Sequence, residues 1–345
     1  MKHLDSFEVG HYRGIDGLSL PDLTHANLIT GSNGVGKTAL LEAIWLFTGR
    51  HNSNLLWNAN VQRSLEQIVD PIAALTTGKV DLSGIEAGSS HRYQVSFEQH
   101  ISNPSRVTIP GTEDLPQLPI VGELRSRLDS IDMQGDRAVR QTPAGLVMHT
   151  VDRTQEQVSC IIEGTGWLLD ANDEHLARYS ELVKRGHKKE LKAAMGLILP
   201  RITDVEILTN ESGRSYVSAL TSSGTRLPLK DLGAGIVRLF RLYLSFFTAR
   251  NGMVLFDEIE NGIHYSVLNT LWDRVRLWMN TWNVQVVAST HSSECIDAAI
   301  AAFEKNPQEL SIHQLYVDST SGELRANCFT GELLEGAREL DLEVR

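Results

Sequence analysis

Hydrophobic and polar residues follow two kinds of pattern in the N-terminal part of the chain. Residues 6–20 alternate as strands do, and a short apolar run at 26–30 ends in a glycine-rich turn. Apolar residues then recur at helical spacing over 37–47, and Gly49 is expected to end this helix. Residues 80–100 alternate around a Gly-Ser-Ser turn, which predicts a hairpin in a strand-rich lobe.

Short apolar runs alternate with helical patterns in the C-terminal part. Helical patterns follow Asp231 and both of the apolar runs at 253–256 and 284–289. This alternation predicts a parallel sheet that is covered by helices on both faces. Between the two parts, four prolines lie within 103–122, helical periodicity extends over 173–197, and a second hairpin is expected next.

The composition is typical of a globular protein. Of the 345 residues, 41% are hydrophobic and 22% are charged. No run of about 18 apolar residues occurs and no apolar leader segment follows Met1, so we expect no membrane contact and a cytoplasmic location. The net charge of -11 disfavours general attraction to nucleic acid. Cys160, Cys295 and Cys328 are too far apart to indicate a disulfide framework or a zinc site, and we expect buried thiols.

A phosphate-binding motif lies between the predicted strand at 26–30 and the helix that follows it. The motif G-x-x-x-x-G-K-[ST] is formed by Gly31, Ser32, Asn33, Gly34, Val35, Gly36, Lys37 and Thr38. Its glycines allow successive main-chain N–H groups to point inward, and the helix N-terminus adds a partial positive charge. Lys37 is therefore expected to contact the β- and γ-phosphates of ATP, and the Thr38 hydroxyl to bind Mg²⁺.

Two carboxylates follow the apolar run at 253–256. The carboxyl ends of parallel strands form the ligand-binding edge of a sheet, so Asp257 is expected to hold Mg²⁺ beside the phosphate loop. Glu258 is expected to orient or deprotonate the attacking water. His291 follows the next apolar run at the same predicted edge, where a γ-phosphate contact is expected.

Together these motifs resemble the ATPase heads of the ABC superfamily. More closely, the segments NLITGSNGVGKTALLEAIWLF, DLGAGIVRLFRLYLSFF, LFDEIENGIHYSVLNTLW and VVASTHSSECIDAA are similar to the RecF/SMC-like branch and to the overcoming-lysogenisation-defect (OLD) ATPases. The resemblance covers residues 1–50 and 200–300 well. It implies an ABC-type P-loop ATPase with ATP and Mg²⁺, in a homodimer or higher homo-oligomer joined through the ATP sites.

The same resemblance assigns a signature motif, which a second subunit presents to the γ-phosphate, to residues 231–235. Its phosphate contacts would come from Gly233, Ala234 and Gly235, where Ala234 replaces the serine that is frequent in such motifs. These contacts are therefore limited to main-chain N–H groups and the N-terminus of the following helix. The resemblance also implies a Mg²⁺-sensing glutamine, for which four candidates remain open: Gln62, Gln67, Gln94 and Gln99.

We accordingly expect an α/β P-loop fold with a mostly parallel core sheet, an antiparallel β lobe and a helical insertion. The expected division is an N-terminal part of the ATPase core at 1–110, a mainly helical insertion at 111–200 and a C-terminal part of the core at 201–345. Full-length OLD proteins also carry a Toprim nuclease domain. The roughly 50 residues after His291 are too few for one, so we do not expect this chain to be a nuclease itself.

Three functional hypotheses follow. The first is a nucleotide-driven dimer switch, which by resemblance to two-gene prokaryotic defence systems would control a separate effector, a nuclease or a toxin. The second is a RecF-like DNA-repair ATPase that contacts DNA through a basic run, although such a run is more often a solvated helix face. That run comprises Lys184, Arg185, His187, Lys188, Lys189 and Lys192. The third is a small-molecule kinase, which would transfer phosphate to an acceptor other than water.

Overall fold

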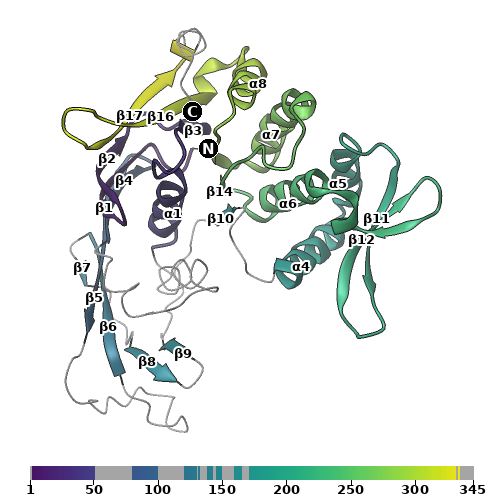
Figure 1. Cartoon of the computed structure of the whole chain (residues 1–345), viewed down its shortest axis with the longest axis horizontal. Helices are drawn as coiled ribbons and strands as arrows, with labels where there is room; N and C mark the ends of the chain where they lie inside the picture. The colour runs from purple at the N-terminus through teal and green to yellow at the C-terminus, as the bar shows by residue number, and fades with distance from the viewer. Residues whose placement is uncertain are drawn as a thin grey trace.

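Three β-sheets and two groups of helices make up the computed structural model, shown in Figure 1. The structure describes residues 2–50, 80–99, 120–129, 131–132, 138–142, 145–149, 159–164, 171–331 and 333–334. The predicted α/β class with a parallel core sheet and antiparallel sheets is confirmed.

The core sheet has six strands in the order β10-β14-β15-β3-β16-β17. Neighbouring strands are parallel from β10 to β16, and β17 is antiparallel to β16. The parallel strands therefore end at one edge, where the motif-bearing loops begin. The strands are β10 (Cys160–Glu163), β14 (Met253–Phe256), β15 (Gln285–Ser289), β3 (Ala26–Gly31), β16 (Leu310–Val317) and β17 (Leu324–Thr330).

Helices cover both faces of the core sheet, as the alternating sequence pattern predicted. Along β14, Val254 and Phe256 belong to one hydrophobic cluster, whereas Met253 and Leu255 belong to the other, because successive strand side chains point to opposite faces. In Figure 1, α1 lies beside β1 and β4, and α6 and α7 lie on the other side of β14. The helices are α1 (Lys37–Thr48), α6 (Ala234–Thr248), α7 (Leu268–Trp282) and α8 (Ser293–Phe303).

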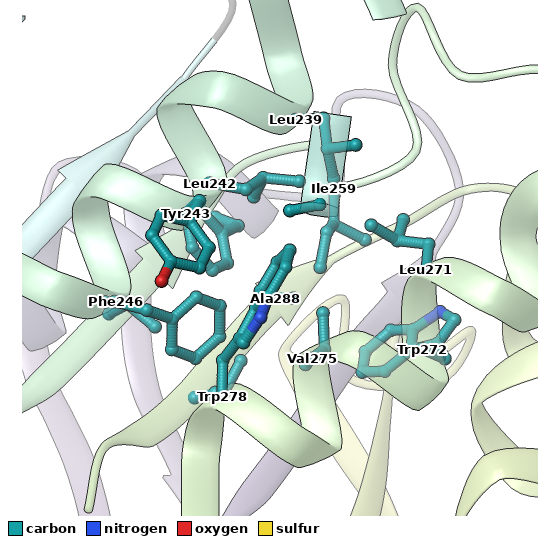
Figure 2. Packing of buried hydrophobic residues seen from close by; sticks show 14 of the residues in the cluster. Leu239, Leu242, Tyr243, Phe246, Ile259, Leu271, Trp272, Val275, Trp278 and Ala288 are labelled. Atoms are coloured by element: carbon teal, nitrogen blue, oxygen red, sulfur yellow. The ribbon is translucent and has the colours of Figure 1, made fainter. Parts of the chain in front are cut away.

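Aromatic and aliphatic side chains from α6 and α7 fill the larger of the two clusters. Figure 2 shows Tyr243 and Phe246 of α6 facing Trp278 of α7. The ring centroids of Tyr243 and Trp278 are 5.2 Å apart in an edge-to-face arrangement, and those of Phe246 and Trp278 are 5.6 Å apart. Such pairs add about 0.5–1.5 kcal/mol each to the burial of apolar surface. This packing fixes α6, and with it the turn before α6, against the acid-bearing strand β14.

An antiparallel sheet forms the predicted β lobe, in the order β2-β1-β4-β5-β6-β8-β9, with β7 paired to β6. The expected hairpin forms from β4 and β5, but its turn is one residue earlier than Gly-Ser-Ser suggested. Ala87 and Gly88 have φ of 47° and 82°, which makes a two-residue turn and leaves Ser89 in the strand. The strands are β1 (Ser6–Tyr12), β2 (Ile15–Leu20), β4 (Val80–Glu86), β5 (Ser89–Gln99), β6 (Ile120–Leu128), β7 (Ile131–Asp132), β8 (Ala138–Thr142) and β9 (Gly145–His149).

Among the described residues of 111–200, helices occur only at the end of the segment, so the expectation of a mainly helical insertion needs correction for this part of the chain. Strands β6 to β9 lie in its first half because β6 pairs with β5 and extends the β lobe. The helical pattern at 173–197 is divided into α4 (Ala171–Lys184) and α5 (Lys188–Met195) by a turn in which Gly186 has φ of 84°. The domain boundaries themselves remain predictions.

A small sheet extends the helical lobe away from the core, as Figure 1 shows. It contains the second predicted hairpin, β11 (Ile202–Thr209) and β12 (Ser215–Thr221), together with the short strand β13 (Arg226–Pro228). The 3-10 helix η1 (Leu229–Leu232) then leads into α6. No helix in the described part of the chain is both long and apolar enough to cross a membrane.

Candidate nucleotide site

The predicted phosphate loop connects the fully buried strand β3 to α1. Gly31 and Gly36 have φ of 135° and 112°, backbone conformations that residues other than glycine rarely adopt. A Cβ atom on Gly31 would lie 2.5 Å from the carbonyl oxygen of Leu315 on the neighbouring strand β16. Among described groups, none accepts a hydrogen bond from the main-chain N–H of Asn33, Gly34 or Gly36. The loop therefore presents open donors of the kind that bind an anion.

Lys37 lies over this loop at the start of α1. Its Nζ donates hydrogen bonds to the carbonyl oxygens of Gly31 (2.7 Å) and Ser32 (3.0 Å). Burial lowers the pKa of Lys37, and the negative charges of Asp257, Glu258 and nearby Glu260 oppose that shift. The Lys37 ammonium group therefore lies close enough to these three carboxylates to interact with them electrostatically.

Asp257 joins the end of β14 to the phosphate loop. The Thr38 hydroxyl donates a hydrogen bond of 2.7 Å to Oδ2 of Asp257, and Oδ1 accepts a second bond from the hydroxyl of Ser289. Ser289 is the last residue of β15, the strand between β14 and β3, and it is fully buried. Two hydroxyls from different strands or helices therefore fix both oxygens of the carboxylate.

Glu258 has a strained backbone that three hydrogen bonds hold in place. Its φ of 48° lies in the left-handed region, which costs a residue other than glycine on the order of 1 kcal/mol. Its N–H donates to Oγ of Ser289 at 2.9 Å, and Nη2 of Arg238 donates to the carbonyl oxygens of Asp257 (2.7 Å) and Glu258 (3.0 Å). The Glu258 side chain is 35% exposed, and its Oε2 accepts a bond from Nδ2 of Asn261.

His291 lies after β15, at the same edge as the acid pair. Its Nδ1 is 3.9 Å from Oε1 of Glu258 and 3.7 Å from Oε1 of Glu260. The side chain is 44% exposed, so the imidazole borders the open side of the site. The structure therefore brings the phosphate loop, both predicted carboxylates and the predicted histidine together.

The signature-like turn packs against Gly262, in the loop that follows the acid pair. Asp231, Gly233 and Ala234 are exposed, and α6 begins directly after Gly233, whose φ is 104°. A Cβ on Gly235 would be 2.7 Å from the carbonyl oxygen of Gly262, so this glycine is required by close backbone packing. No hydrogen bond or ion pair within the described part of the chain joins 231–235 to the phosphate loop.

Half of the basic run is engaged in contacts within the helical lobe. Arg185 pairs with Glu181, Lys188 pairs with Asp204, and the His187 ring packs against Trp282 with centroids 4.7 Å apart. The remaining members, Lys184, Lys189 and Lys192, are exposed.

The other sequence candidates are less well defined. Gln62 and Gln67 lie outside the described residues, as does the Gln99 side chain, and no hydrogen bond between described residues joins Gln94 to the site.

All three cysteines have free thiols; Cys295 is buried as expected, whereas Cys160 and Cys328 are half-buried.

Three residues of the site were not predicted from the sequence: Arg238, Glu260 and Ser289. The sequence does contain a signal for two of them. Ser289 is a polar residue at the end of an apolar run, and Glu260 is the third acid in Asp-Glu-Ile-Glu. Arg238 lies among apolar residues of α6, and only the packing of that helix on β14 shows its contact with the acid pair.

Comparison with protein families gives a match that covers somewhat under half of the chain. A family model described as "AAA domain, putative AbiEii toxin, Type IV TA system" matches residues 127–297. The matched region includes the acid pair and His291 but starts after the phosphate loop. A search of curated protein sequences finds no match.

Comparison with solved structures gives similarity over nearly the whole chain. The SMC head bound to the C-winged helix domain of ScpA aligns with a TM-score of 0.50 and 12% identity, covering 97% of this chain and 100% of that chain. The SMC head domain from Thermotoga maritima has a TM-score of 0.45 and 13% identity, covering 94% and 98% of the two chains. An SMC head from Pyrococcus furiosus bound to the C-terminal domain of ScpA has a TM-score of 0.48 and 12% identity, covering 99% and 98%. At 12% identity the first match shows the fold alone, which is similar to that of an SMC head.

Proposed function

We propose that this chain binds and hydrolyses ATP, and that ATP closes two copies into a dimer which hydrolysis reopens. The proposal rests mainly on the hydrogen bond between Thr38 and Asp257. This contact joins an anion-binding loop to an acid-bearing strand end, the two parts that a nucleoside triphosphate and its metal ion require.

Thr38 and Asp257 fit a Mg²⁺ site. Both offer oxygen atoms, which Mg²⁺ prefers, and Mg²⁺ is commonly held by one or two protein oxygens together with substrate phosphates. The described residues contain no cluster of three or more histidine, cysteine or acidic side chains suited to a metal. When bound, the ion would neutralise charge on the β- and γ-phosphate oxygens.

The phosphate loop and Lys37 would hold the triphosphate, and Glu258 would act as the base. Glu258 accepts one proton from a water molecule as the water oxygen bonds to the γ-phosphorus. The bond from that phosphorus to the β–γ bridging oxygen breaks, its electron pair remains on ADP, and inorganic phosphate is released. The strained backbone of Glu258, held by Arg238 and Ser289, supports a precise placement of this carboxylate.

The dimer is supported by the exposed signature-like turn at 231–235. The open N-terminus of α6 offers main-chain N–H groups and a partial positive charge to an anion outside its own subunit. Arg238, one turn into α6, also holds the backbone of Asp257 and Glu258. A partner's γ-phosphate bound at this turn would therefore act on a helix that contacts the catalytic acids.

For the biological role, we propose the ATPase component of a prokaryotic anti-phage defence system that controls a separate nuclease or toxin. The resemblance to OLD ATPases supports this role, and the toxin–antitoxin wording of the matched family description is consistent with it. The effector would be found by testing which protein co-purifies with the chain in the presence of ATP and is lost with ADP.

The dimer switch is tested by measuring mass and phosphate release on the same samples. Light scattering should show a dimer of Glu258→Gln with ATP and Mg²⁺ and a monomer with ADP, because the variant retains the metal site but lacks the base. Wild type should release phosphate without any added acceptor, which a small-molecule kinase would not do. Full turnover by Glu258→Gln would assign the base to another residue, and a monomer in every nucleotide state would refute the switch.

The exposed lysines of the basic run support DNA binding as a second candidate. Lys184 is the last residue of α4, and Lys189 and Lys192 lie in α5, the next helix along the chain. If they contact a duplex, ATP-dependent affinity should fall steeply with salt, and reversing the three charges should abolish binding. Absence of DNA binding at low salt would remove this candidate.

A further inference from the structure

Glu260, three residues after Asp257, forms hydrogen bonds with the residues that follow β15. Its Oε1 accepts hydrogen bonds from the Thr290 hydroxyl (2.7 Å) and from the main-chain N–H of His291 (3.2 Å). The residue is 9% exposed. This carboxylate therefore fixes the backbone position of the histidine that the proposed function places near the γ-phosphate.

The second oxygen of Glu260 is buried and has no partner. No donor lies within hydrogen-bond distance of Oε2 among the described residues. A buried acceptor left without a donor costs about 1–3 kcal/mol, and more when it carries charge. A glutamine could make the same two bonds through its amide oxygen without burying a charge, so anchoring the backbone alone does not explain a carboxylate here.

The imidazole of His291 is a suitable partner for this charge. Its Nδ1 lies 3.7 Å from Oε1 of Glu260, and the side chain is half-exposed. Lys37 and Arg238 also interact electrostatically with Glu260. Nζ of Lys37 and Nη2 of Arg238 are bonded to main-chain carbonyls, whereas Nε of Arg238 has no partner among the described residues and makes no hydrogen bond to Glu260.

Glu258 competes for the same nitrogen but is less suited to hold it. Its Oε1 lies 3.9 Å from Nδ1 of His291, its side chain is more exposed, and its other oxygen is bonded to Asn261. A charge pair is screened less in a buried position than in an exposed one. Glu258 must also remain free to accept a proton, whereas Glu260 is held by Thr290.

We propose that Glu260 is the positioning residue of His291: it anchors the histidine backbone and binds Nδ1, so that Nε2 is presented to the γ-phosphate. A carboxylate on one imidazole nitrogen determines the orientation of the ring and which nitrogen remains available. This inference rests on the proposed ATPase function. Glu260 acts through His291 and does not itself contact the nucleotide.

Glu260→Gln tests the charge while keeping the anchoring oxygen. We expect kcat for phosphate release to fall by roughly 10-fold to 100-fold, the usual contribution of a carboxylate that orients a histidine, with KM and ATP affinity within about 2-fold of wild type. Glu211→Gln, an exposed glutamate at the tip of the β11–β12 hairpin, is the matched control and should have wild-type kinetics.

A double-mutant cycle with His291→Ala shows whether the effect passes through the histidine. In the His291→Ala background, Glu260→Gln should change the rate by less than about 2-fold. Single-turnover assays with enzyme in excess can follow the slow variants. An equal loss in both backgrounds, or wild-type kcat in Glu260→Gln, overturns the inference.

Two further outcomes are distinguishable. If wild type releases no phosphate, the ATPase proposal fails and this inference fails with it; if wild type is active and Glu260→Gln is too, only this inference fails. Should Glu260→Gln not fold, Glu260→Asp tests the position of the carboxylate instead, because it keeps the charge on a shorter side chain. It should lower kcat by a smaller factor in wild type and have no effect beside His291→Ala.

Discussion

The hydroxyl of Thr38 and the carboxylate of Asp257 form a hydrogen bond of 2.7 Å across 219 positions of sequence. Thr38 belongs to α1, which follows β3 and the phosphate loop. Asp257 directly follows β14, which is separated from β3 by one strand, β15. Ser289, on the strand between them, binds the other oxygen of the same carboxylate. The geometry of the proposed metal and phosphate site is therefore set by three separate segments, and variants in each should affect it differently.

Lys37→Ala should weaken ATP binding by roughly 100-fold, because contacts from an ammonium group to phosphates contribute about 3 kcal/mol. The measurement is titration with a fluorescent ATP analogue. Lys189→Ala removes an exposed lysine of the helical lobe and should bind ATP as wild type does. An unchanged affinity in Lys37→Ala would contradict the assignment of this lysine.

Gly31→Ala should destabilise the protein by more than about 3 kcal/mol, whereas Gly34→Ala should cost about 1 kcal/mol. Both glycines have positive φ, but only at Gly31 would a Cβ meet a backbone atom, the Leu315 oxygen at 2.5 Å. Urea denaturation of the two variants measures the difference. Equal stabilities would show that β3 and β16 can separate locally at little cost.

Arg238→Met should lower the free energy of unfolding by about 2–4 kcal/mol and also slow ATP hydrolysis. Methionine cannot donate the two hydrogen bonds that the buried guanidinium makes to the carbonyl oxygens of Asp257 and Glu258. The strained backbone at Glu258 is then held by fewer hydrogen bonds. Denaturation and phosphate release are compared with Arg201→Met, which alters an exposed arginine. Retention of full activity would show that the acid pair is held well enough without Arg238.

The buried His313 should make the protein less stable in mild acid. Burial lowers the pKa of His313 from about 6.5 to about 4, so the unfolded state takes up a proton first as the pH falls. Its contribution is fully present above about pH 6.5 and is lost as the pH falls toward 4, by on the order of 3 kcal/mol. Denaturation at pH 7.5 and pH 5 should show a smaller loss for His313→Gln than for wild type. The same loss in both proteins would mean that other groups cause it.

Local sequence order was sufficient to predict the elements that carry the proposed chemistry. The phosphate loop is contiguous, its glycines and its place between an apolar run and a helical pattern are visible in the sequence, and the parallel-sheet rule brought Asp257 and His291 to the same edge. Prediction was weaker in 111–200. There β6 forms strand because it pairs with β5, and that pairing is a property of the assembled sheet.

Contacts between distant segments decided the remaining features of the site. Arg238 is one of two arginines in a largely apolar helix, and its bonds to Asp257 and Glu258 exist only because α6 packs across β14. In the sequence, Glu260 is only the third acid of a short motif. In the structure, Thr290 and His291 after β15 donate hydrogen bonds to one of its oxygens, and the other oxygen is buried. Hydrogen bonds and burial depend on which surfaces meet, and the spacing of residues along the chain does not contain that information.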